Sequence, residues 1–382
     1  QHILRGRSKE KCIITGNDSA LHWKKETLER YFILFIGLLW FARWVLISYG
    51  IFFKTFLGAQ MLFQLPSHVR TLRLVAEILT ILLFSLGCLW YYRFGRNKKS
   101  GKFIFGGYAL LEVSYYFLAN NRSRLLYFLV IVFLFWVFSG KRRMPIKGIL
   151  AAVIIFVFLI MPLGWVMRNL SYSVVPSRAG NQQVCLVAFD LLPRSVNYLF
   201  HNYWESFATN RLMNYNAVRL SGLNLFAATL EERFDGRRPL LYGKTMYRLF
   251  PILVPRLIWP TKPNFLEYER PEGMILLHYG FSLRDEMITP VTELYTNFGV
   301  VGIFFGMIIF GLGFRYFWEY VRRKNFSDMA IVLYASAILP FVKMEMAIVP
   351  GVGIALRNMA LIWIVCKIID KTSKHERLKN GM

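Results

Sequence analysis

Acidic residues and cysteines are both scarce in this chain of 382 residues. Asp and Glu total 22 against 47 Lys and Arg, and charged residues make up only 18% of the sequence. The four cysteines are scattered without paired spacing, so the sequence predicts neither a disulfide framework nor a zinc site. The basic, polar stretch that begins at Gln1 lacks the order of a signal peptide. Because it does not start with Met, we expect upstream sequence to be missing.

Apolar residues dominate what is present. The chain is 55% hydrophobic and 17% aromatic, which is too apolar for a soluble protein of this length and predicts a multi-span membrane protein. A net charge of +25 first suggests nucleic acid. The basic residues, however, form short clusters between apolar runs, and no basic face recurs with interleaved aromatics. We therefore expect no nucleic-acid partner.

Apolar runs of helix-spanning length predict about eight transmembrane helices and an all-α polytopic fold. The third and fourth runs are short for a bilayer core of about 30 Å. The runs cover residues 31–56, 72–92, 103–119, 124–140, 148–167, 293–318, 329–349 and 354–369.

The positive-inside rule orients these spans, because basic clusters mark alternate loops. We expect residues 1–30 to form a basic cytoplasmic segment and 31–167 to hold five spans. Residues 168–290 then form one large external loop, 293–369 hold three spans, and 370–382 form a cytoplasmic tail. Both ends of the chain are thus expected in the cytoplasm.

The external segment 168–290 combines short amphipathic stretches with many arginines. The stretches "CLVAFDLLPRSVNYLF", "MYRLFPILVPRLIW" and "MILLHYGFSL" predict helices that lie in the interface or cap a cavity. Twelve of its fourteen basic residues are Arg, whose guanidinium grips phosphate oxygens in bidentate fashion. This favours a lipid-linked phosphate or diphosphate as ligand. Attraction to anionic head groups is the alternative.

Charged residues within the apolar runs are costly unless they are paired or face a cavity. Arg43 lies in the first run, and Glu77 and Glu112 lie in the next two. We expect a structural ion pair, either Arg43–Glu77 or Arg43–Glu112. Arg122 and Arg124, in "NNRSRLL", begin a span and either anchor it or bind a diphosphate.

The stretch "TPVTELYTNFGVVG" (289–302) places a carboxylate at a membrane boundary. Thr289 and Pro290 predict an N-cap followed by proline at the first helical position. Glu293 then falls where the helix dipole favours an anion. Gly302 and Gly306 permit close helix contact, so Glu293 is expected on a rigid element. It is either a structural carboxylate or a general base.

Two histidines of the external segment are further candidates for a base. His201 and His278 can both accept a proton near neutral pH, although a histidine among aromatics is more often structural. The proline-rich stretch 242–264 also holds Pro255–Arg256, a step that either aims the guanidinium or marks a turn.

The sequence resembles the Wzy-type O-antigen or oligosaccharide repeat-unit polymerases of bacterial surface polysaccharide assembly. The resemblance rests on "TELYTNFGVVGIFFGMIIFG" (292–311), "LVPRLIWPTKP" (253–263), the Arg-Ser step of "NNRSRLL" and the single large loop. Arg211 and Gly222 also match the Arg-x10-Gly pattern of such polymerases. The resemblance covers the architecture and roughly a quarter of the chain. Family members usually carry more spans than eight.

The resemblance implies a GT-C-like fold and an inverting, metal-independent glycosyl transfer at the periplasmic face of the inner membrane. The glycan would leave its undecaprenyl diphosphate carrier and join the next lipid-linked repeat unit, with a chain-length regulator as a possible partner and no cofactor. The implied site has catalytic, diphosphate-binding and sugar-binding parts. They are Glu293, His278 and Arg211 for catalysis; Arg122, Arg124, Arg211, Arg256 and Arg284 for diphosphate; and Tyr242, Tyr247, Trp259 and Tyr295 for sugar.

Two other functions share part of this pattern. An O-antigen ligase would use the same donor and topology but transfer the glycan to lipid A core. A transporter or flippase of lipid-linked sugars would have less external mass than the segment 168–290 provides.

Overall fold

A computed structural model of the chain shows helices joined by turns, with no strand in the part that it describes. The description covers residues 23–49, 66–119, 121–138, 163, 166, 191–198, 201, 223–234, 238–254, 259, 271–280, 288–342 and 347–380. The helices are α2 (Lys25–Ser48), α4 (Ser67–Trp90) with a π-helical turn (Tyr91–Gly95), α5 (Lys99–Leu118), α6 (Arg122–Phe138), α11 (Leu223–Phe234), a 3₁₀ turn (Met246–Arg248), α12 (Leu249–Leu253), α13 (Pro271–His278), α14 (Pro290–Arg323), α15 (Asp328–Val342) and α16 (Ile348–Asn380).

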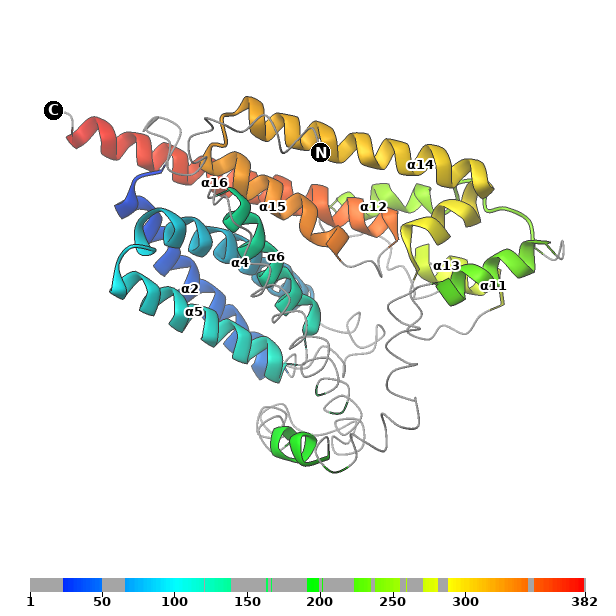
Figure 1. The fold of residues 1–382 in the computed structure, drawn as a ribbon, viewed down its shortest axis with the longest axis horizontal. Helices are drawn as coiled ribbons and strands as arrows, with labels where there is room; N and C mark the ends of the chain where they lie inside the picture. Colours follow the sequence, from blue (N-terminus) through cyan, green and yellow to red (C-terminus); the bar gives the residue numbers. More distant parts are fainter. Residues whose placement is uncertain are drawn as a thin grey trace.

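The helices form two groups that share one apolar core (Figure 1). Helices α2, α4, α5 and α6 make one group, and α14, α15 and α16 lie side by side in the other. Helix α15 contacts α4 and α6, and α16 contacts α2 and α4, so these two helices join the groups. The short helices α11 and α12 pack on α14 and α16 respectively.

Helix α4 is the centre of the core, because the stretch after Glu77 is almost wholly apolar and carries no charged residue. In its most apolar window 72% of the residues are buried, against 11% in α14. Helix α14 instead exposes a continuous apolar surface that includes Val300, Phe304 and Ile309. An exposed face of this kind is stable in lipid rather than in water.

Within the described residues, four helices are long and apolar enough to cross a membrane: α2, residues 68–95, α14, and residues 348–376 of α16. Shorter apolar helices run over residues 124–138 and 328–342. Seven of the eight expected spans overlap a described helix. The other one, 148–167, lies outside the described residues apart from Leu163 and Val166. The all-α class is therefore confirmed, whereas the number of spans stays a prediction.

Three short helices coincide with the amphipathic stretches expected between residues 168 and 290. Residues 191–198 are helical, and so are 246–253 and Pro271–His278. Helix α11 was not predicted, although Gly222 directly before it and Gly236 shortly after it could have marked its ends.

Arg43 pairs with Glu112, the second of the two expected partners. Its guanidinium donates to both carboxylate oxygens at 2.9 and 2.7 Å, and also to the Tyr116 hydroxyl at 2.8 Å. All three side chains are buried. Because the charges balance and the donors are used, this cluster holds α2 against α5.

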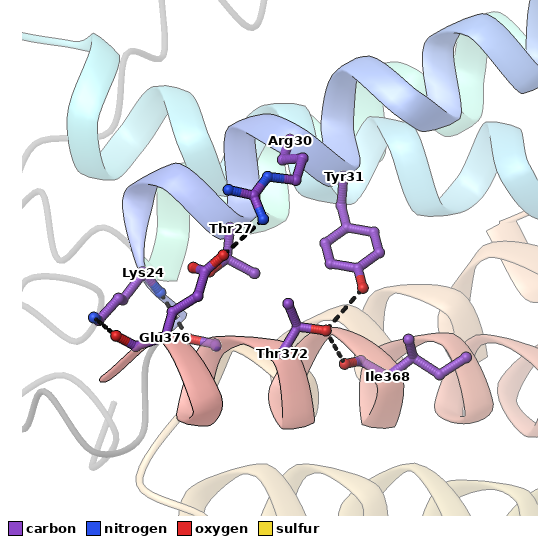
Figure 2. Close-up of polar contacts among 8 residues, drawn as sticks. Lys24, Thr27, Arg30, Tyr31, Ile368, Thr372 and Glu376 are labelled. Carbon is purple, nitrogen blue, oxygen red and sulfur yellow. Dashed lines mark hydrogen bonds and ion pairs between the residues drawn. The ribbon is translucent and has the colours of Figure 1, made fainter. Parts of the chain in front are cut away.

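A second set of polar contacts joins the start of α2 to the end of α16 (Figure 2). Glu376 accepts from Arg30 at 2.8 Å and from the Thr27 hydroxyl, while Lys24 Nζ donates to the Glu376 carbonyl at 2.7 Å. Since Thr372 donates to the Ile368 carbonyl, its hydroxyl oxygen accepts from Tyr31 at 2.9 Å. These contacts fix the ends of two long helices to each other.

Candidate functional site

Helix α14 begins as the sequence predicts but does not continue as one rod. Thr289 caps it, its hydroxyl accepting from the Thr292 N–H at 3.2 Å, and Pro290 occupies the first turn. At Gly299 the backbone turns to φ 68° and ψ −156°, a conformation that glycine tolerates and other residues rarely adopt. The prediction of one continuous span over residues 293–318 is thus wrong, because residues 290–298 form a short helix of their own and the longer helix follows the break at Gly299.

The two halves of α14 fold against each other around Gly302 and Gly306. A Cβ on Gly302 would lie 2.6 Å from the Leu294 carbonyl oxygen and 2.5 Å from Phe298 Cβ. A Cβ on Gly306 would collide with the Leu294 side chain. The expected close contact at these glycines therefore exists, and the partner is the helix's own first half.

Residues 241–245, which belong to the long segment 168–290, pack against the break in α14. The N–H groups of Leu241 and Tyr242 donate to the carbonyls of Thr296 and Asn297, both at 3.0 Å. The Asn297 amide donates to the Thr245 hydroxyl at 2.7 Å and is buried. Leu241 and Tyr242 thus satisfy backbone carbonyls at the interrupted helix end, where lipid offers no hydrogen-bond donor.

His278 holds the same segment from the other side. Its Nε2 lies 2.7 Å from the Pro239 carbonyl oxygen, which can only accept, so Nε2 carries the proton. In the neutral ring Nδ1 then bears the lone pair and can accept a proton. His201 has its Nδ1 3.1 Å from the Asn197 carbonyl and is exposed.

Glu293 lies between two helix beginnings. It is fully buried in the first turn of α14, and its Oε2 accepts from the Val349 N–H at 3.1 Å in the first turn of α16. Both helix dipoles favour a carboxylate here. This geometry matches the structural alternative for Glu293, while its role as a base stays a prediction.

The aromatic residues predicted to bind sugar divide into two sets. Tyr242 and Tyr247 are 74% and 69% exposed, and Trp259 is also exposed. Tyr242 adopts a positive φ of 47°, which is strained for a bulky residue. Tyr295 is instead buried, and its ring packs edge-on against Phe226 of α11 with centroids 5.5 Å apart. A stacking role for Tyr295 would require α11 to move.

An open apolar groove of about 640 Å³ starts at the break in α14. It runs between the second half of α14 and helices α15 and α16. Leu294, Phe298 and Met246 line the end nearest the break, and Phe310 and Phe341 line its length. Its size is in the range that binding pockets for small molecules occupy.

The diphosphate-binding arginines are only partly within the described residues. Arg211, Arg256 and Arg284 lie outside them, and the side chain of Arg122 is not described. The Arg124 side chain is 15% exposed, and its guanidinium lies 3.3 Å from the Glu77 carboxylate and 5.3 Å from the centre of the Tyr127 ring.

The features that sequence reasoning missed are the break at Gly299 and the pairing of Asn297 with Thr245. An Asn-Phe-Gly step inside an apolar run is a turn signal, and this signal could have revealed the break. No sequence pattern singles out Thr245 among the hydroxyl-bearing residues of the segment 168–290.

Within the described residues, no group of three or more His, Cys, Asp or Glu could hold a metal ion. Comparison with known proteins finds no matching family model, no matching curated protein and no matching solved structure.

Proposed function

We propose that this protein polymerises oligosaccharide repeat units carried on undecaprenyl diphosphate, at the periplasmic face of the bacterial inner membrane. The observation that carries the proposal is the apolar groove that ends at the polar break in α14. A substrate that fits this arrangement has a long apolar tail and a polar head. A lipid-linked glycan has this form, and the resemblance of residues 292–311 to Wzy-type polymerases gives the reaction.

The polar head of the substrate meets exposed aromatic residues and a set of arginines. Tyr242, Tyr247 and Trp259 present ring faces on which sugars stack. Arg124, together with Arg122, Arg211, Arg256 and Arg284 as predicted from the sequence, binds the diphosphates. The glycan therefore lies over residues 238–254 and Trp259 while its lipid lies in the groove.

The reaction is a single displacement that inverts the anomeric carbon. A hydroxyl oxygen of the acceptor unit attacks this carbon, the bond to the donor diphosphate breaks, and the arginines neutralise the negative charge of the leaving group. The hydroxyl proton passes to a general base. The geometry supports His278 in this role, because Nδ1 has a lone pair and Glu293 is fully buried with one oxygen on α16.

The test incubates purified protein with a synthetic repeat unit on a diphosphate lipid, with and without a chelator. We expect a ladder of elongated products in both cases. A single glycan block added to lipid A core would identify a ligase instead, and movement across vesicles without a new bond would identify a transporter. Metal dependence would contradict the arginine-only mechanism.

Two variants separate the candidate bases. His278→Gln should lower the elongation rate at least about a hundredfold, since general bases contribute on the order of 10²–10⁴. Glu293→Gln keeps an oxygen for the Val349 N–H and should retain elongation, with a stability loss of about 1 kcal/mol. The reverse result, with loss only in Glu293→Gln, would restore Glu293 as the base.

A further inference from the structure

Arg73, Arg124 and Arg357 gather where one end of α4 meets α6 and α16, and Arg70 lies one turn before Arg73 on α4. We call these four residues the arginine cluster. Residues 70, 73 and 77 recur on one face of α4 at helical spacing. Glu77 Oε1 lies 3.8 Å from Arg73 Nε and 3.3 Å from Arg124 Nη2. Arg357, on α16, lies within electrostatic range of both Glu77 and Arg124.

The charges of the arginine cluster are not balanced within the described residues. In that part of the chain, both ion pairs of the arginine cluster use the same carboxylate, Glu77. The Nε and Nη1 groups of Arg70 are buried and have no hydrogen-bond partner in the described part of the chain, and the same holds for Arg357 Nε. Arg357 Nη2 makes one long contact, 3.4 Å from Asn358 Oδ1.

Unsatisfied guanidinium donors are expensive inside apolar helices. Each buried N–H without an acceptor loses its hydration, and like charges repel more strongly at low dielectric. The balanced cluster around Arg43 shows the alternative, in which every donor toward Glu112 and Tyr116 is used. The arginine cluster is therefore arranged for an anion that brings its own acceptor oxygens.

We propose that Arg70, Arg124 and Arg357 bind the phosphate group of a lipid. Phosphate oxygens match the forked guanidinium geometry and accept several hydrogen bonds at once. The position among membrane-length helices favours a phosphate that enters from the bilayer. Two sources share this chemistry: the head group of a membrane phospholipid, and the carrier diphosphate of the substrate. The second source rests on the proposed function, whereas the first does not.

The arginine cluster has a direct connection to the site at α14. Arg357 follows Val349 by eight residues on α16, a rise of about 12 Å. Val349 donates to Glu293, and Leu356, next to Arg357, lines the apolar groove. Phosphate bound at Arg357 would therefore act on the helix that also forms the groove wall.

The experiment measures binding to purified wild type by native mass spectrometry, with phosphatidylglycerol, farnesyl diphosphate and inorganic pyrophosphate as separate probes. The variants are Arg70→Gln and Arg357→Gln. The matched control is Arg322→Gln, whose side chain is 64% exposed and pairs with Glu319 on the surface. We expect each cluster variant to bind a lipid phosphate at least about tenfold more weakly than wild type, and the control to bind normally.

A fourth variant keeps the proposal testable if the arginine variants fold poorly. Glu77→Gln releases Arg73 and Arg124 from their shared carboxylate, so affinity for a lipid phosphate should rise about threefold or more. Affinity that is equal in wild type, Arg70→Gln and Glu77→Gln would overturn the proposal, as would binding of neither lipid. Phosphatidylglycerol alone identifies a bilayer lipid as the source, and farnesyl diphosphate alone identifies the carrier. Because no glycan is transferred in this assay, its outcome is independent of polymerase activity.

Discussion

Among the charged residues that the structure describes within the apolar helices, the group around Arg43 and the arginine cluster differ in how completely they are paired. Around Arg43 a bidentate carboxylate and a hydroxyl take up the guanidinium donors. In the arginine cluster, buried donors of Arg70 and Arg357 have no partner among the described residues. A charge that is fully paired inside the molecule is suited to hold helices together. A charge that is not fully paired is suited to bind a ligand, which makes the second group the better guide to function.

The strongest test of this difference removes one arginine charge from each group and compares the losses of stability. Arg43→Gln leaves Glu112 buried without its partner, so we expect a loss of about 3–5 kcal/mol in the free energy of unfolding. Arg357→Gln removes a charge that the fold does not pair, and we expect little loss of stability. Unfolding in mixed micelles measures both. Equal losses would show that the two groups do not differ.

A smaller effect is expected where α14 folds back on itself. Gly302→Ala places a Cβ against the backbone carbonyl of Leu294, so one half of the helix must shift. We expect a stability loss of about 1–3 kcal/mol and weaker binding of lipid in the groove. Gly311→Ala is the control, because nothing lies within 4 Å of its added Cβ. An unchanged Gly302→Ala protein would mean that the fold-back is not required.

The smallest effect is expected at the ends of α2 and α16. Arg30 is 67% exposed in its ion pair with Glu376, and exposed ion pairs contribute only about 0–1 kcal/mol. Arg30→Ala should therefore change the unfolding midpoint little, and added salt should weaken the pair further. A loss as large as that of Arg43→Gln would show that this contact acts as a buried pair.

The helices could be predicted from the sequence better than their contacts could. Apolar runs located most of them, because lipid-length hydrophobic segments have few alternatives to helix. The Thr289 cap and three of the short helices between residues 168 and 290 followed from local chemistry. An ion pair of Arg43 was also expected, with either Glu77 or Glu112 as its partner. In contrast, the break at Gly299 does not lower the hydropathy of the surrounding sequence. Hydropathy alone therefore predicts one continuous span in α14.

The candidate site depends on pairs that are distant in sequence. Glu293 was expected in a first turn, but its partner Val349 lies 56 residues away. Arg124 was a candidate from the sequence, whereas no sequence pattern singled out Arg70 or Arg357. Their meeting with Glu77 is set by the packing of α4, α6 and α16, and no local pattern encodes it.

The length of α16 has a practical consequence for topology mapping. At about 1.5 Å per residue its 33 residues extend about 50 Å, whereas a bilayer core is about 30 Å thick. The final turns, which carry Glu376 and the exposed Leu378, therefore reach past the lipid by several turns of helix. A single cysteine introduced at position 378 would be open to a membrane-impermeant maleimide from one side of the membrane alone. The side that labels would give the orientation of every helix in the bundle.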